Sequence, residues 1–94
     1  MDPYEALLAL ARAEADLVAD GRWEDAADLG RRRAELVASL PETPPAEAAD
    51  ALREARQVML ASMGAASVAV AETRTALRRL NDGRRAVAGY ARSA

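Results

Sequence analysis

The chain has 94 residues and is 51% apolar, but it lacks Phe and only 3% of its residues are aromatic. A core of Ala, Leu, Val and Met suits closely packed helices. Cys and His are both absent, which removes disulfides, the common zinc ligands and the usual general base, so we expect no enzyme, no cofactor and no metal site. The formal net charge of -2 gives no global field that favours nucleic acid.

The first predicted helix spans about residues 3–20. Asp2 is a suitable N-cap, Pro3 suits the first helical position, and Glu5 stands where a capping box needs an acid. Apolar residues then recur at helical spacing and form a broad face. Gly21 fits the left-handed position that follows a helix, so the helix should end there.

A second helix is predicted over about residues 24–40, directly after Trp23. Trp23 either closes the junction between the first two helices or contacts a partner. Arg33 falls on the apolar face, where its side chain should reach past the Leu side chains to solvent or pair with an inward acid such as Glu14. Three prolines within residues 41–45 end the helix. The apolar face comprises Ala26, Leu29, Leu36, Val37 and Leu40.

The third predicted helix is the longest and spans about residues 46–80, or roughly 52 Å. One of its faces follows the alternating spacing of a left-handed coiled-coil seam. A flank of small residues beside the seam should let a neighbouring helix approach closely. Gly83, in the sequence Asn-Asp-Gly, can stop or bend the helix, which leaves residues 81–94 as a tail. The seam comprises Leu52, Arg56, Met59, Met63, Ala66, Val70, Thr73, Leu77 and Leu80.

These features predict one all-α domain over residues 1–94. We expect a three-helix antiparallel bundle, or a hairpin with a long third helix, paired in a homo-oligomer. The first two helices can pack antiparallel against half of the third or lie nearly end to end along all of it. A seam that they leave uncovered needs a partner, which is either an amphipathic client helix or a second copy.

Charge is unevenly distributed along the chain. Residues 2–20 carry one Arg and five acids, whereas residues 61–94 carry six Arg and two acids. The two ends should therefore attract each other or their counterparts in a second subunit. Acids near the start, where a signal peptide needs basic residues, and the lack of a long apolar run predict a cytoplasmic protein with no membrane span.

Two stretches of the chain resemble the FliT-type flagellar export chaperones. The first begins at Gly21-Arg22-Trp23-Glu24, the Gly-x-Trp-acid step of that family, and the second matches its C-terminal Leu, Gly, Ala, Tyr pattern. The matching residues after the step are Ala26, Leu29, Arg33, Leu36 and Leu40, and those of the second stretch are Leu77, Leu80, Gly83, Ala86 and Tyr90.

The resemblance implies a cytoplasmic helical chaperone for flagellar type III export. Such a protein binds the helical C-terminal region of an unassembled late flagellar subunit, typically the filament cap protein, and brings it to the export ATPase complex. By this analogy the partner-binding residues include Leu36, Leu40, Leu77 and Leu80, and the seam adds Met59 and Met63. The alternative is a structural or regulatory helical-bundle homo-oligomer with no export role.

Overall fold

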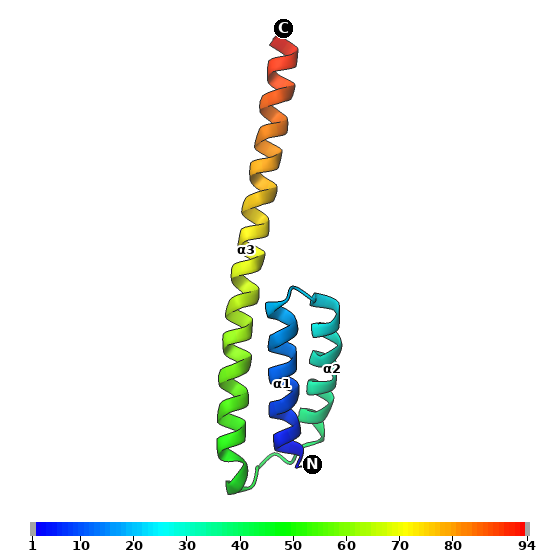
Figure 1. Cartoon of the computed structure of the whole chain (residues 1–94), viewed down its shortest axis with the longest axis vertical. Helices are drawn as coiled ribbons and strands as arrows, with labels where there is room; N and C mark the ends of the chain where they lie inside the picture. Colours follow the sequence, from blue (N-terminus) through cyan, green and yellow to red (C-terminus); the bar gives the residue numbers. More distant parts are fainter. Residues whose placement is uncertain (1, 94) are drawn as a thin grey trace.

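The computed structural model describes residues 2–93 and is all-helical over that range (Figure 1). It is elongated, with extents of 73 × 22 × 19 Å. The three predicted helices are confirmed. The elements are α1 (Pro3–Ala19), α2 (Trp23–Ser39), the short 3-10 helix η1 (Ala46–Ala48) and α3 (Ala49–Ser93).

Both ends of α1 are formed as the sequence predicts. The Asp2 carboxylate accepts a hydrogen bond from the Tyr4 backbone N–H at 2.8 Å, which satisfies one of the free donors of the first turn. At the other end Gly21 has a φ of 72°, and its N–H donates to the Val18 carbonyl at 3.1 Å. This tight left-handed ending turns the chain so that α2 runs back along α1.

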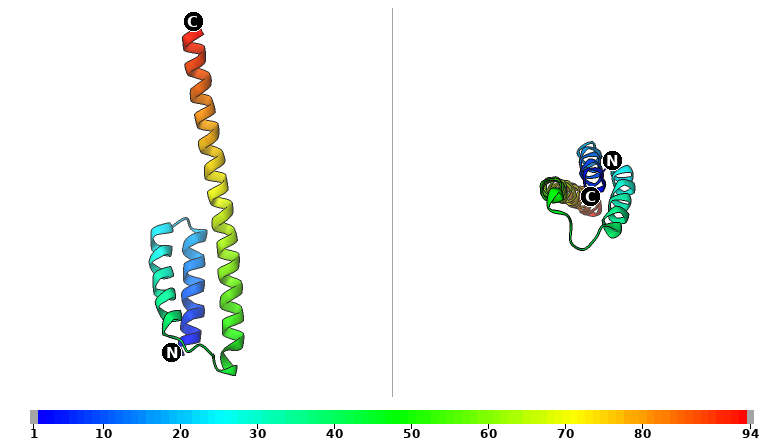
Figure 2. Two further views of the ribbon diagram at one scale, coloured as in Figure 1. Left: turned by 180° about the vertical axis from the view of Figure 1, so that it is seen from behind. Right: turned by 90° about the horizontal axis from the view of Figure 1, so that it is seen from below.

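α1 is the middle helix of the three. It packs against α2 on one side and α3 on the other, whereas α2 and α3 make no comparable contact with each other within residues 2–93 (Figures 1 and 2). Leu7, Ala11 and Ala55 form the buried centre where α1 meets α3. The first two helices are therefore an antiparallel hairpin against half of α3, which resolves the alternative left open by the sequence. The partly buried side chains around this centre are Leu8, Leu36, Leu40, Leu52, Val58 and Met59.

The helix predicted over residues 46–80 differs from α3 at both ends. Residues 46–48 form η1, and α3 continues to Ser93 without a break, so the prediction of a tail from residue 81 is wrong for the described residues. A helix that ends at Gly83 would need that residue in the left-handed region. Among the residues described, only Gly21 has such a φ, and Gly83 is instead an ordinary helical residue that costs about 1 kcal/mol relative to Ala.

The C-terminal half of α3 extends well past the hairpin (Figure 1). We call residues 70–93 the distal arm; its 24 residues give a length of about 36 Å. Its Leu77 and Val87 side chains are 56% and 70% exposed. The arm therefore presents a long helical surface with little of the chain packed against it.

No helix in the described part of the chain is long and apolar enough to cross a membrane.

Candidate functional site

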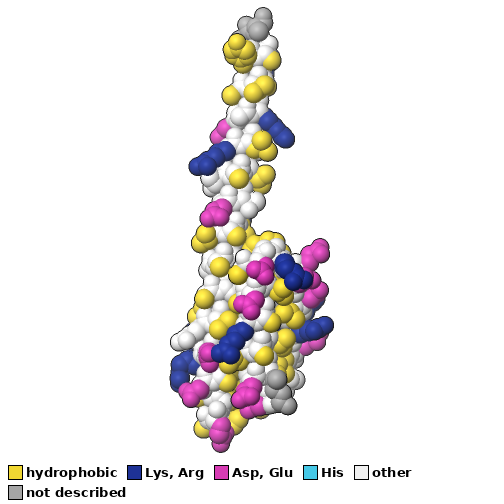
Figure 3. All heavy atoms as spheres, in the orientation of Figure 1, with side chains coloured by type: hydrophobic (Ala, Val, Ile, Leu, Met, Phe, Trp, Pro, Cys, Tyr) yellow, Lys and Arg dark blue, Asp and Glu magenta, His cyan; other side chains and the backbone are white. Residues whose placement is uncertain are grey.

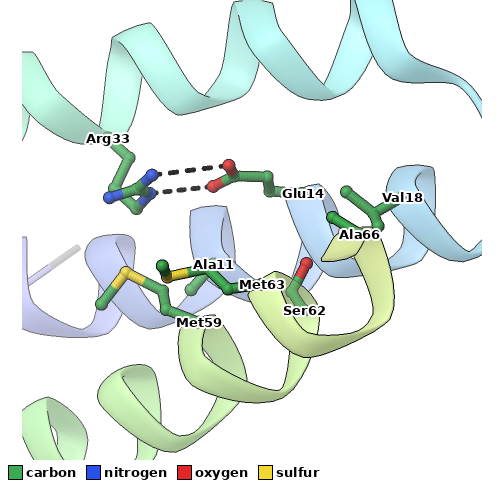
Figure 4. Close-up of a pocket in the computed structure, with 8 residues that line it drawn as sticks. All are labelled: Ala11, Glu14, Val18, Arg33, Met59, Ser62, Met63 and Ala66. Carbon is green, nitrogen blue, oxygen red and sulfur yellow. Dashed lines mark hydrogen bonds and ion pairs between the residues drawn. The ribbon is translucent and has the colours of Figure 1, made fainter. Parts of the chain in front are cut away.

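An open groove lies between α2 and α3, and α1 forms its floor (Figure 4). It exists because α1 separates the two outer helices. Met59 and Met63 project from α3 on one side, and Arg33 lies across from them on α2 (Figure 4). The groove is mostly apolar, and it is lined by Ala11, Glu14, Val18, Arg33, Met59, Ser62, Met63 and Ala66.

The charged part of this groove is an ion pair between α1 and α2. Arg33 Nε lies 2.8 Å from Glu14 Oε2, and Arg33 Nη2 lies 3.4 Å from Glu14 Oε1. The two side chains are only 29% and 20% exposed. Gly30 leaves space for this arrangement, because a Cβ there would lie 3.1 Å from Glu14 Oε1. The predicted pairing of Arg33 with Glu14 is confirmed, and it neutralises both charges in the groove.

Trp23 extends the groove toward the distal arm. It is the first residue of α2, and a second hollow is bounded by its side chain and by Ala69, Val70, Thr73 and Arg74 of α3. The indole is 48% exposed. This half-exposed position beside α3 is compatible with both roles that the sequence left open for Trp23. The concave surface thus continues along α3 from Met59 to Arg74.

The structure divides the six predicted partner-binding residues into two groups. Leu36, Leu40 and Met59 are partly buried and pack against the buried centre where α1 meets α3, and Met63 is 65% exposed in the groove. Leu77 and Leu80 lie on the distal arm, 56% and 52% exposed. Leu36 and Leu40 belong to α2 and its C-cap and the other four residues to α3, and the six do not form a single pocket.

Some groove residues were not among those predicted to bind a partner. Ser62 and Ala66 line the groove, as does Ala11 of α1. For Ser62 the available signal was the row of small residues beside the seam, which predicted close packing on that flank of α3. The row comprises Ala55, Ser62, Ala69 and Ala76. Ala55 of this row is 1% exposed, which agrees with that expectation. The sequence pattern did not indicate on which side of α3 the packing of α1 would leave a groove.

Charge separates the distal arm from the rest of the molecule. Residues 70–93 carry six Arg and two acids, a net +4, whereas residues 2–69 carry seven Arg and 13 acids, a net -6. Apolar and Arg side chains lie next to each other along the arm (Figure 3). The arm is therefore both apolar and basic, beside an acidic hairpin.

A comparison with known protein families shows the family of this chain. The family model described as "Flagellar protein FliT" matches residues 1–92, which include α1, α2 and nearly all of α3. The chain belongs to the FliT family. Neither the curated proteins nor the solved structures give a match.

FliT membership confirms the resemblance seen in the sequence. It implies a role as a flagellar export chaperone, and such chaperones are not enzymes. Within residues 2–93 no group of three or more acidic side chains is placed to hold a metal ion.

Proposed function

We propose that this FliT protein is a cytoplasmic chaperone whose groove between α2 and α3 holds the C-terminal helix of a late flagellar subunit, the filament cap protein. The observation that carries the proposal is the open groove between α2 and α3. Two helices flank α1 without covering the space between them, and the Met63 and Trp23 side chains beside it are 65% and 48% exposed. A client helix placed there would complete a four-helix bundle.

The groove has the chemistry expected for an amphipathic helix. Such a helix recognises its groove through apolar side chains at helical spacing, and the flexible thioether of Met63 adapts to different side chains. A longer client helix would continue past Trp23 onto Leu77 and Leu80. Covering the apolar stripe of an unassembled subunit prevents its aggregation, and delivery to the export ATPase complex is the next step of the proposed role.

The test is a double substitution of exposed groove and arm residues, Met63→Asp with Leu77→Asp. Binding of the C-terminal segment of the filament cap protein is measured by isothermal titration calorimetry. Because each buried side chain contributes about 1.5–3 kcal/mol, the Kd should rise at least about 100-fold. Helicity should change little, since the two side chains are 65% and 56% exposed.

Val68→Asp is the matched control. Val68 is 58% exposed and lies on another face of α3, beside Ala71 and Glu72. This variant should bind the segment with the affinity of the wild type. Undiminished binding by the double variant would contradict the groove assignment. A stable homo-oligomer that binds no flagellar subunit would instead support the structural or regulatory alternative.

A further inference from the structure

Four of the six Arg side chains of the distal arm share one flank of α3. They are separated by four, seven and seven positions, so at about 3.6 residues per turn they fall within an arc of about 40° around the helix. Along the helix axis they span about 27 Å. We call this set the basic row, and it comprises Arg74, Arg78, Arg85 and Arg92.

The structure leaves the basic row in solvent. All four residues are exposed, and in the described part of the chain none of them forms an ion pair. Arg92 Nε donates to the Ala88 carbonyl of its own helix at 3.4 Å. The nearest acid by helical spacing is Asp82, four residues after Arg78 and three before Arg85. One carboxylate offsets only one of the four charges, so the row has an excess of positive charge without a partner in its own chain.

The basic row borders the half-exposed apolar seam of the arm on one side only. Helical spacing places Arg74 about 40° around the helix from Val70. The other border of the seam carries Ala76 and Gly83, which are small and uncharged. A helix that packs on the seam therefore meets guanidinium groups along one edge, and along the other edge it can approach α3 closely.

We propose that the basic row selects client helices that carry acidic residues at seven-residue intervals along the edge that faces it. This inference rests on the proposed function, because it names the class of helix that the arm accepts. Three of the four Arg repeat every seven residues, and a client helix packed along the seam presents equivalent positions at the same interval. Asp or Glu at successive positions of this kind would each face one guanidinium.

The charge of the hairpin restricts where these acids lie in the client. Residues 2–69 carry a net -6, whereas the arm carries a net +4. An acidic edge is therefore attracted to the arm and repelled beside the hairpin. The client helix should carry its acids on the part that lies along the arm and few of them on the part that lies in the groove.

The same charges argue against a polyanion along the whole of α3. A nucleic acid or an anionic membrane that followed the helix would meet the acidic hairpin as well as the arm. Tyr90 is the one aromatic residue of the arm in the sequence, so bases would find a single stacking platform there. A helix with acids along one edge matches both the spacing of the basic row and its position beside the apolar seam.

Isothermal titration calorimetry with the C-terminal segment of the filament cap protein tests the basic row. Arg78→Glu should raise the Kd at least about fivefold, because it replaces an attraction by a repulsion. Arg79→Glu is the matched control. It makes the same change in charge at the next residue, which lies with Val68 on another face of α3, and it should change the Kd less than about twofold. Circular dichroism verifies that both variants keep their helicity.

Charge reversal in the client identifies the facing acids. Each Asp and Glu of the segment is replaced in turn by Lys, and binding is measured to the wild type, to Arg78→Glu and to Arg85→Glu. A segment variant that binds the wild type weakly and regains affinity with one Arg variant identifies a facing pair, because a general loss of helicity would not be restored. The acids rescued by Arg78→Glu and by Arg85→Glu should lie seven positions apart.

Equal weakening by Arg78→Glu and Arg79→Glu, or the absence of any rescued acid, would overturn the role of the basic row. If Met63→Asp with Leu77→Asp still abolished binding, the proposed function would stand without it. A segment that does not bind the wild type at all would contradict the proposed function itself. Binding of the wild type to phosphatidylserine vesicles that is lost in Arg78→Glu would assign the row to anionic lipids and overturn the proposal.

Discussion

Arg33 lies on the face of α2 that packs against α1, where a charged side chain needs a partner. Its bonds to Glu14 at 2.8 and 3.4 Å join the two helices of the hairpin. Spacing placed Arg33 between Leu29 and Leu36 on an otherwise apolar face, which predicted either this pairing or a side chain that reaches past the Leu residues to solvent. The role of Gly30, which leaves space for Glu14, was not predictable, because it depends on how closely the two helices approach.

At the residue scale we predict that the Glu14–Arg33 pair stabilises the hairpin. Arg33→Ala should lower the free energy of unfolding by about 1–2 kcal/mol, because it leaves a poorly solvated carboxylate without its partner. Urea denaturation of Glu14→Ala, of Arg33→Ala and of the variant with both substitutions gives the coupling energy between the two side chains. The control is Arg12→Ala, since the Arg12–Glu54 pair is 55% and 50% exposed and should contribute less than about 1 kcal/mol.

The coupling energy between Glu14 and Arg33 tests whether the pair stabilises the hairpin. If removal of Arg33 costs no more than removal of Arg12, or if the effects of Glu14→Ala and Arg33→Ala simply add, the pair does not hold α1 against α2.

At the scale of the elements, helix starts were easier to predict than helix ends. Asp2 and Pro3 are specific to a helix start, and the end of α1 was predictable because Gly21 is followed directly by a new helical pattern. Gly83 was also a candidate for a helix end, but α3 continues through it to Ser93. Glycine is compatible with both a left-handed cap and an open helix interior, and the residues after Gly83 are good enough helix formers to continue α3.

Substitutions at Gly64 and Gly21 test how glycine contributes in a helix interior and at a left-handed cap. Apart from its chain neighbours and the backbone of its own helix, a Cβ at Gly64 would meet no atom within 4 Å, so Gly64→Ala should raise the free energy of unfolding by about 0.5–1 kcal/mol through helix propensity alone. Gly21→Ala should lower it by about 1 kcal/mol, because its φ of 72° suits few residues with a side chain. Urea denaturation measures both, and a destabilising Gly64→Ala would mean that this position is covered.

At the scale of the whole molecule, periodicity predicted the faces of each helix but not their angular arrangement. The apolar seam of α3 is compatible with a hairpin on either of its flanks. The structure places α1 between the other two helices and leaves the groove on one side. The candidate residues Leu77 and Leu80 were predictable as apolar positions, but their place beyond the hairpin depends on where α1 and α2 stop.

The uncovered distal arm also has a thermodynamic consequence. A compact chain of this length gains a heat capacity of about 1.2–1.4 kcal/mol/K on unfolding, because water reaches buried apolar groups. Residues 70–93 already meet water in the folded monomer, so the measured gain should be lower by about a quarter. Scanning calorimetry at concentrations where the protein is monomeric tests this prediction. A gain of the full size would contradict it, because the arm would then be covered within a single chain. A gain that increases with protein concentration would show that the arm withdraws from water only when chains meet.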